Sequence, residues 1–364
     1  MSEQFDVAIM GGGPAGTSAA ISAARAGMCV LLVDRDTFPR PRVCGEFVSS
    51  ESLALLSDLL GGAHPLLTQT LPIAEGRLFI GKSVTDTHID PPGRSIPRYE
   101  LDHALWQAAS SAGVFTHAGT PVTQVKGAGP FTIHTRDKSY ETRSVIHAAG
   151  RWSSLLGKLE PPPGPKWIGM KAHYATGVDQ ATVDLYFFPG GYCGVQPVRE
   201  GVINVCAMVR SDVANSLEEI TRCHPALQVR SLRWSRITEL VATAPLIHSA
   251  PLPVQNNVFL VGDAAGFIDP FLGDGISLAL QTGALAARAV ASFVSRDVPL
   301  AGALDIYANA YRHDILPCFQ HAARLRRVLS SSQPFQAALT GLLKVPHITE
   351  WLLRKTRPKV APAD

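Results

Sequence analysis

The chain has 364 residues, of which 46% are hydrophobic and 17% are charged, and its formal net charge is +3. This composition excludes a disordered protein, and the length exceeds that of one small domain. The six cysteines show no C-x-x-C or zinc spacing, so we expect reduced thiols in a cytoplasmic protein, with no metal site.

The first predicted elements are two apolar strands joined by a glycine turn and a helix. Residues 7–10 and 30–33 are apolar, and a run of small residues from Pro14 to Ala26 predicts a helix between them. No signal peptide is expected, because the first strand starts at Phe5.

The turn itself matches the G-x-G-x-x-G pattern at Gly11, Gly13 and Gly16. Its glycines allow a tight turn, close approach of a pyrophosphate, and close packing of helix on strand. The pyrophosphate would lie at the helix N-terminus, beside Pro14 and Ala15, where free N–H groups and the helix dipole favour an anion.

An acid follows the second strand. Asp34 stands where a carboxylate holds the hydroxyls of a ribose, after an interval typical of dinucleotide-binding domains. The sequence therefore predicts a dinucleotide site built on this unit.

In the middle of the chain, apolar and polar residues alternate in a way that predicts β-strands. Residues 61–97 contain short strand-like pieces and turn residues, and a helix is predicted from Leu101 to Ala112, with strands after it. Residues 157–165 are proline-rich and predict a linker. Residues 166–250 predict a separate sheet, with a helix at 216–223.

A second strand that ends in glycine and an acid favours FAD over NAD as the dinucleotide. Residues 258–261 predict a buried strand that runs into Gly262 and Asp263, and a helix from about Gly273 to about Arg296 follows. Such an acid can bind the ribityl hydroxyls of FAD, and the helix would stabilise a reduced flavin by roughly 0.3–2 kcal/mol. This helix contains polar residues, so we do not expect it to span a membrane.

The C-terminal segment, residues 299–364, is predicted to be helical. From residue 321 on it carries eight basic residues against two acidic ones: Arg324, Arg326, Arg327, Lys344, Arg354, Lys355, Arg357 and Lys359 against Glu350 and Asp364. We favour a packed helix pair with a solvated basic face over a surface that binds anionic lipid or a carrier protein. A nucleic-acid partner is not expected.

Taken together, these motifs make residues 5–295 resemble the para-hydroxybenzoate hydroxylase-like FAD-dependent oxidoreductases, and most closely their geranylgeranyl reductase branch. Arg98–Asp102 resembles the family's R-x-x-L-D element, and residues 43–46 resemble the Cys-Gly loop near the isoalloxazine ring. Val122 stands where the family's backbone meets adenine. Residues 147–155 resemble a modified A-D-G-x-x-S motif, with Ala149 at the place of the aspartate.

The resemblance implies an α/β fold with a Rossmann-like FAD-binding domain interleaved with a β-sheet substrate domain. The FAD-binding domain would comprise residues 1–60, 98–156 and 251–298, and the substrate domain residues 61–97 and 166–250. The implied cofactor-binding residues are Gly11, Gly13, Pro14, Ala15, Gly16, Asp34, Arg35, Arg42, Cys44, Arg98, Val122, Gly262, Asp263, Pro270, Gly273, Gly275 and Ile276.

Four activities are compatible with this resemblance. A monooxygenase that hydroxylates or epoxidises a lipophilic or aromatic metabolite is favoured slightly over a carbon–carbon double-bond reductase. NADPH, NADH or a partner reductase would supply the electrons. A halogenase is disfavoured because residues 190–197 lack the W-x-W-x-I-P segment, and a non-catalytic flavin sensor is the fourth possibility.

Candidate catalytic residues are Cys44, as a proton donor or flavin-tuning thiol, and Glu46, as an acid or base. His173 and His248 are further candidates. Tyr186, Phe188 and Tyr192 of the predicted middle sheet are the candidate substrate contacts, with core packing as the alternative role.

Overall fold

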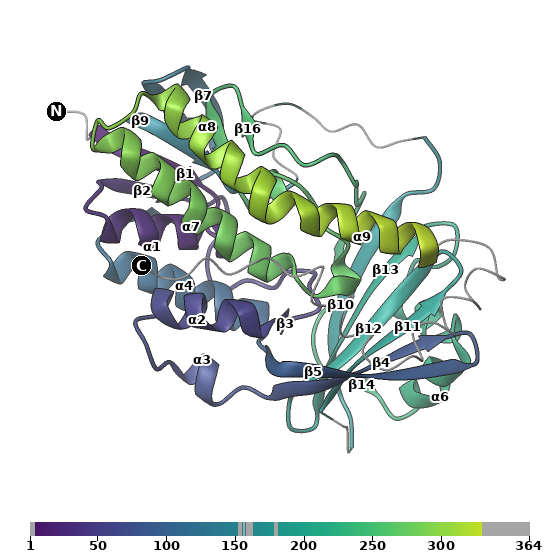
Figure 1. Ribbon diagram of the computed structural model, residues 1–364. Helices are drawn as coiled ribbons and strands as arrows, with labels where there is room; N and C mark the ends of the chain where they lie inside the picture. The colour runs from purple at the N-terminus through teal and green to yellow at the C-terminus, as the bar shows by residue number, and fades with distance from the viewer. Residues whose placement is uncertain (1–3, 152–154, 156, 158–162, 178–180, 330–364) are drawn as a thin grey trace.

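The computed structural model describes residues 4–151, 155, 157, 163–177 and 181–329. Its elements form two β-sheets that lie side by side, with helices over the first sheet and at the outer face of the second (Figure 1). This is the mixed α/β architecture that the sequence predicted, and the prediction of fold class is confirmed.

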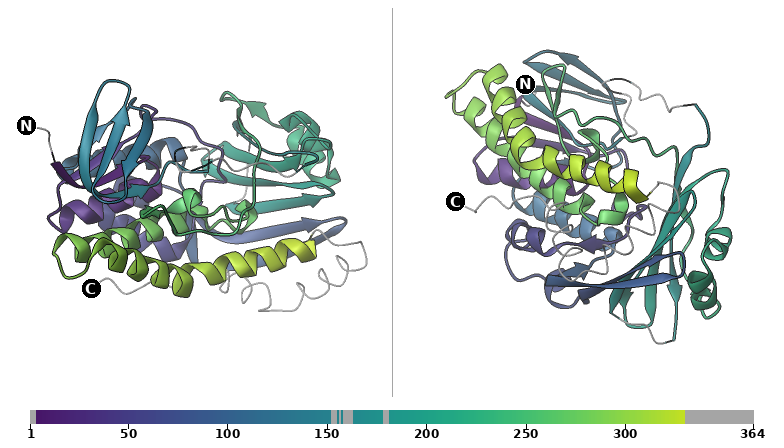
Figure 2. Two further views of the ribbon diagram at one scale, coloured as in Figure 1. Left: turned by 90° about the horizontal axis from the view of Figure 1, so that it is seen from above. Right: turned by 45° about the vertical axis from the view of Figure 1, so that its right-hand side comes forward.

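The first sheet is mainly parallel and has the strand order β16-β17-β9-β1-β2-β6. β1 pairs in parallel with β2 on one side and with β9 on the other, so that Ile9 lies opposite both Leu32 and Ile146. An antiparallel meander of β7 and β8 continues from β9, seen above the sheet in Figure 2. The strands are β1 Gln4–Met10, β2 Val30–Val33, β6 Phe115–His117, β7 Val122–Gly127, β8 Phe131–Thr135, β9 Ser139–His147, β16 Val254–Gln255 and β17 Val258–Leu260.

Helices α1 and α7 pack closely against each other on this sheet. The small side chains of α1 permit the approach, and Gly283 of α7 lies so near that an added Cβ would stand 2.2 Å from the Ala15 carbonyl oxygen. By length and apolar composition α7 is the one helix among the described residues that could span a membrane, but 61% of its most apolar 18-residue stretch is buried within the protein. The helices of this layer are α1 Pro14–Arg25, α2 Ser50–Leu59, α3 Pro65–Thr68, α4 Arg98–Ser111 and α7 Gly275–Val294.

The second sheet is mainly antiparallel, with the order β14-β10-β13-β12-β11-β4-β5-β3, and β15 pairs with β10. Residues 91–93, which we expected in a turn, lie within the long strand β5, and Phe47–Val48 joins this sheet rather than the first. The strands are β3 Phe47–Val48, β4 Pro72–Ile80, β5 Ser83–Ser95, β10 Trp167–Ala175, β11 Thr182–Phe188, β12 Gly191–Arg199, β13 Val202–Arg210, β14 Ser235–Arg236 and β15 Val241–Thr243.

The two faces of the second sheet differ in chemistry because side chains alternate along each strand. The outer face forms an apolar core with helices α5 Leu217–Arg222 and α6 Pro225–Ser231. Arg230 of α6 is bonded to Asp184 and to the Tyr186 hydroxyl, which fixes α6 on this face. The inner face carries Lys171, His173 and Asn204 and is turned towards the first layer.

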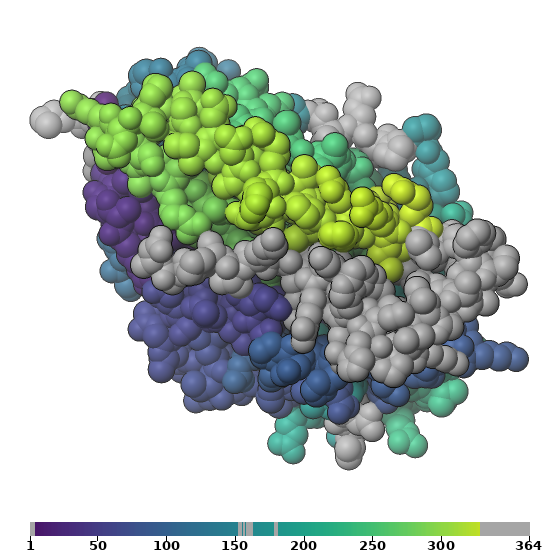
Figure 3. All heavy atoms as spheres, in the orientation of Figure 1, coloured from purple at the N-terminus to yellow at the C-terminus, as the bar shows by residue number. Residues whose placement is uncertain are grey.

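After α7 the chain forms α8 Leu300–Ala310, a π-helical turn η3 Tyr311–Ile315, and α9 Leu316–Leu329. α9 leads from the first layer towards the second sheet, and these helices form a continuous ridge on one face (Figures 1 and 3). Most of the basic C-terminal residues lie outside the described residues. So do residues 152–154 of the A-D-G-x-x-S-like motif and residues 158–162 of the predicted linker.

Candidate functional site

The glycine turn after β1 is tightly packed at Gly11 and Gly16 and open at Gly13. A Cβ at Gly11 would stand 2.4 Å from the Ala148 carbonyl oxygen, and one at Gly16 would stand 1.8 Å from the Gly11 oxygen. A Cβ at Gly13 would meet no protein atom within 4 Å. Gly13 precedes Pro14 and Ala15 at the start of α1, where backbone N–H groups have no partner within the helix. The open space thus lies where a pyrophosphate would bind.

Asp34 at the end of β2 has its carboxylate fully engaged by protein donors. It accepts the Gly12 N–H at 2.6 Å, the Asp36 N–H at 2.8 Å, and both terminal nitrogens of Arg40. These bonds fill the four acceptor directions of a carboxylate. A ribose hydroxyl at Asp34 would therefore have to replace a protein donor, and the ribose role of Asp34 stays a prediction.

Arg40, which the sequence did not suggest, is buried and lies over the Phe38 ring at 4.4 Å. Arg42 is bonded to Asp36, whereas Arg35 is exposed at 3.6 Å from that carboxylate. The cofactor contacts predicted for Arg35 and Arg42 stay predictions.

The Gly262–Asp263 strand end follows β17, which lies two strands from β1 in the same sheet because both strands pair with β9. The Gly262 N–H donates to the Thr282 hydroxyl at 2.9 Å, and Asp263 pairs with Arg151 at 3.2 Å. Asp263 keeps 41% of its side-chain surface exposed, so its carboxylate stays accessible to a ligand.

The start of α7 completes this part of the site. Gly273 has φ +76°, and a Cβ there would stand 2.9 Å from the Phe47 ring; a Cβ at Gly275 would meet nothing within 4 Å. Pro270 begins the short helix η2 Pro270–Leu272 just before this point, and Ile276 is buried within α7. Two open glycines, Gly13 and Gly275, thus stand at the N-termini of two packed helices.

Arg98 and Val122 lie further along the first layer. Arg98 begins α4, is largely buried, and forms two 2.8 Å hydrogen bonds to the buried carboxylate of Asp102. Burial would lower the pKa of Arg98, but Asp102 outweighs it and raises that pKa, so Arg98 is a cation. Val122 begins β7 and is half-buried.

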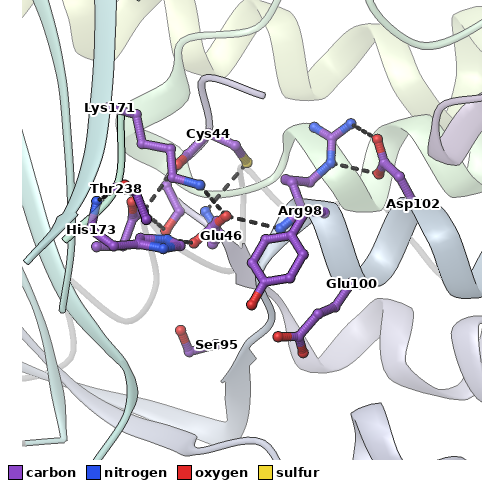
Figure 4. Close-up of polar contacts among 12 residues, drawn as sticks. Cys44, Glu46, Ser95, Arg98, Glu100, Asp102, Lys171, His173 and Thr238 are labelled. Atoms are coloured by element: carbon purple, nitrogen blue, oxygen red, sulfur yellow. Dashed lines mark hydrogen bonds and ion pairs between the residues drawn. The ribbon is translucent and has the colours of Figure 1, made fainter. Parts of the chain in front are cut away.

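The Cys-Gly loop, residues 43–46, lies between β2 of the first sheet and β3 of the second. The Asn204 amide of β13 donates to the carbonyl oxygens of Cys44 at 3.0 Å and Gly45 at 2.9 Å. The Glu46 N–H in turn donates to the Cys44 sulfur at 3.3 Å (Figure 4). These bonds fix both the backbone and the thiol of the loop.

Glu46 is fully buried and adopts a left-handed backbone conformation, with φ +64°. Its carboxylate accepts from the Lys171 ammonium, from His173 Nε2 at 2.7 Å, and from the Arg98 backbone N–H at 2.9 Å. A non-glycine residue with positive φ is uncommon and persists where the surroundings hold it. Here three donors from two elements hold the side chain.

Burial and charge set the protonation of this loop. Burial raises the pKa of the Cys44 thiol, and the cations Arg98 and Lys171 oppose this only in part. Burial would also raise the pKa of Glu46, but the His173 hydrogen bond and the Lys171 charge outweigh it and hold that pKa below its ordinary value. The loop therefore carries a neutral thiol beside a carboxylate.

Comparison with known proteins agrees with this geometry. A family model described as FAD dependent oxidoreductase matches residues 6–39. Digeranylgeranylglycerophospholipid reductase 2 of Methanopyrus kandleri is 26% identical over 349 residues, which cover 90% of this chain and 87% of the relative. The menaquinone reductase of Mycolicibacterium smegmatis is 28% identical over 324 residues, which cover 80% and 78%.

The chain is an FAD-dependent oxidoreductase. Its resemblance to the para-hydroxybenzoate hydroxylase-like superfamily and its geranylgeranyl reductase branch is confirmed.

Solved structures share the fold of this flavoprotein. A geranylgeranyl bacteriochlorophyll reductase-like protein from Thermoplasma acidophilum superposes with a TM-score of 0.78 and 22% identity, covering 97% of this chain and 96% of its own. A flavin-dependent brominase superposes with a TM-score of 0.79 and 20% identity, covering 97% and 93%. At these identities the likeness extends to the fold alone.

The described residues of the flavoprotein fit FAD. The space above Gly13 matches a pyrophosphate, and the accessible carboxylate of Asp263 stands across the sheet edge from it. The open N-terminus of α7 at Gly275 presents a positive helix end beside the Cys-Gly loop, because Phe47 packs on Gly273 and Ser49 is bonded to Ser277 at 2.7 Å.

The three predicted substrate contacts lie on different faces of the second sheet. Tyr186 and Phe188 point into the outer core beneath α5 and α6, where they pack with Phe79 and Ile168. Tyr192 points to the inner face. Its ring lies 5.8 Å from that of Phe187 and 5.9 Å from that of Phe271 in η2. Substrate contact therefore stays a proposal for Tyr192, and packing is the role that the structure gives the other two.

His248, the second histidine candidate, contacts the segment that precedes η2. Its Nε2 is 3.1 Å from Asp269, which also pairs with Arg326 of α9 at 3.0 Å. This arrangement holds α9 against the loop before η2.

Sequence reasoning missed Lys171 and Asn204, which hold the Cys-Gly loop. One pattern contained the information. Along β10, Lys171 and His173 point to one face of the sheet and Met170 and Ala172 point to the other. Asn204 of β13 lies opposite His173. Buried polar residues that recur at every second position of a strand indicate a functional face.

Proposed function

We propose that the flavoprotein is a carbon–carbon double-bond reductase that acts on a lipophilic, prenyl-type substrate. The observation that carries the proposal is the neutral Cys44 thiol, immobilised by Asn204 and Glu46 in the loop beside the α7 N-terminus. The named relatives, a digeranylgeranylglycerophospholipid reductase and a menaquinone reductase, support it. They favour this function over the monooxygenase that the sequence alone favoured.

Double-bond reduction adds a hydride to one carbon and a proton to the other. Bound FAD, when reduced by a nicotinamide or a partner reductase, supplies the hydride. The chain must supply the proton from a group that is protonated at neutral pH, and burial keeps the Cys44 thiol in that state. The thiolate left behind regains its proton from solvent.

The inner face of the second sheet is suited to an apolar substrate. In an aromatic cluster, Phe271 of η2 meets the Phe187 and Tyr192 rings edge-to-face, and those two rings are tilted against each other. Aromatic side chains of this kind bind apolar chains and exclude water. Contact with a membrane through the basic C-terminal segment, and delivery of the substrate on a carrier protein, remain proposals.

The test is the mass of the product. Holoenzyme is incubated without oxygen, with dithionite as reductant, and with a geranylgeranyl-bearing phospholipid in detergent micelles. We expect a product that has gained two hydrogen atoms, and Cys44→Ser is expected to slow its formation at least tenfold with the FAD content unchanged. A product that appears only with dioxygen and carries one added oxygen atom would refute the reductase and restore the monooxygenase.

A further inference from the structure

Glu46 and the side chains that bind its carboxylate form a polar cluster next to Cys44 that is buried from solvent. Glu46 is fully buried, and the side chains of Lys171 and His173 are 4% and 5% exposed. The carboxylate therefore exchanges hydrogen bonds with protein groups and not with bulk water. It stands two residues from Cys44, whose sulfur accepts the Glu46 N–H.

Cations surround the thiol from two elements. Arg98 of α4 interacts with Cys44 and is paired with Asp102, and Lys171 faces the loop from β10, beside the His173 ring. β13 contributes the neutral groups Asn204 and Cys206, and β12 contributes the Tyr192 hydroxyl, whose pKa burial raises well above its ordinary value. Asp102 is held by Arg98, so Glu46 is the carboxylate that offsets the Lys171 ammonium.

We propose that Glu46, held by Lys171 and His173, is a positioning residue that keeps Cys44 protonated by offsetting the positive charges around it. The carboxylate does not touch the substrate in this account. It acts through the thiol, as the charge that decides whether Cys44 is a proton donor or a thiolate. This role rests on the proposed function for its use in catalysis, but the charge effect exists without any substrate.

The left-handed backbone at Glu46 supports this role. A bulky residue at φ +64° is strained, yet this conformation places the carboxylate against β10 and the N–H against sulfur. Glycine would satisfy the turn without strain, but it would leave the Lys171 ammonium buried and unpaired beside Cys44.

Two substitutions with opposite electrostatic effects test the proposal. Glu46→Gln removes the negative charge and leaves the cations, so it should lower the pKa of Cys44. Lys171→Met removes a cation and leaves the carboxylate, so it should raise that pKa or leave it unchanged. Local loosening of the structure would shift both variants in the same direction, because it would expose the thiol to water in either case.

The measurement is the pH dependence of Cys44 alkylation by iodoacetamide in the holoenzyme, followed by mass spectrometry of the peptide. Cys44→Ser serves as the blank. For Glu46→Gln we expect the midpoint to fall by about one pH unit or more, which corresponds to roughly tenfold faster alkylation near neutral pH. For Lys171→Met we expect no fall.

A midpoint that is the same in Glu46→Gln and wild type would overturn the proposal, as would equal downward shifts in both variants. If Glu46→Gln does not fold, Lys171→Met against wild type carries the test, because loss of a cation should raise the midpoint or leave it unchanged, and a fall would overturn the proposal. The assay needs no substrate. An unshifted midpoint would overturn the role of Glu46 but not the reductase proposal. Failure to reduce a double bond would overturn the reductase proposal but not the effect of Glu46 on the Cys44 pKa.

Discussion

At the scale of single residues, Gly13 and Gly16 belong to one motif but have opposite surroundings. A Cβ at Gly13 points into open space, whereas a Cβ at Gly16 would collide with the Gly11 carbonyl oxygen. Gly13→Ala should therefore leave the FAD-free protein within about 1 kcal/mol of wild type and weaken FAD binding at least tenfold. Gly16→Ala should lower the free energy of unfolding by about 2 kcal/mol or more.

Chemical denaturation of the FAD-free proteins and titration with FAD check this pair. A Gly13→Ala variant with wild-type FAD affinity would show that the pyrophosphate binds elsewhere.

His147 at the end of β9 couples stability to pH. It is 4% exposed, burial lowers its pKa to about 4 from 6.5, and its Nδ1 has no hydrogen-bond partner among the described residues. Because the folded pKa lies below the unfolded one, the unfolded chain binds the proton first as the pH falls. The protein should thus lose stability between about pH 6.5 and 4, by roughly 3 kcal/mol in total.

His147→Gln should flatten this part of the stability profile, as measured by denaturant unfolding at a series of pH values. If the free energy of unfolding of the mutant fell with pH as steeply as that of wild type in this range, groups other than His147 would cause the loss of stability.

The sequence identified several single residues of the site but not the contacts between them. Cys44, Glu46 and His173 were each identifiable by residue type and motif. Their connection was not, because it depends on β10 approaching a loop about 125 residues earlier in the chain. Lys171 and Asn204 were missed because the alternation along β10 indicates a polar face of the strand but not that this face meets Cys44.

At the scale of elements, the contact between α1 and α7 depends on one glycine. In an exposed helix, alanine in place of glycine stabilises by about 1 kcal/mol. Gly283→Ala should instead destabilise by about 2 kcal/mol or more, because its Cβ would stand 2.2 Å from the Ala15 carbonyl oxygen.

Gly302→Ala in α8 is the matched control, because its nearest contact would be 3.3 Å from the Val298 Cβ. It should stay within about 1 kcal/mol of wild type. Thermal unfolding of both variants measures the contrast, and equal effects would mean that the two helices separate at little cost.

Elements differed in how well the sequence predicted them. The first strand–helix–strand unit was predicted because apolar runs and a glycine turn specify it locally. The β4–β5 hairpin was predicted only as short pieces, because prolines and glycine at residues 91–93 resemble a turn. Pairing with β4 and β3 holds that stretch in a strand.

At the scale of the whole molecule, the site arises where the two sheets meet. The first layer supplies the nucleotide cradle and the α7 N-terminus, and the inner face of the second sheet supplies Lys171, His173, Asn204 and the aromatic cluster. The Cys-Gly loop joins them.

The most direct test of the account is the oxidant that the reduced flavoprotein accepts. Protein reduced with dithionite without oxygen would be mixed in a stopped-flow instrument either with a geranylgeranyl lipid in micelles or with aerated buffer, and the flavin absorbance followed. The account predicts rapid, saturable reoxidation by the lipid and slower reoxidation by air. Reoxidation by dioxygen alone, with no response to the lipid, would contradict it.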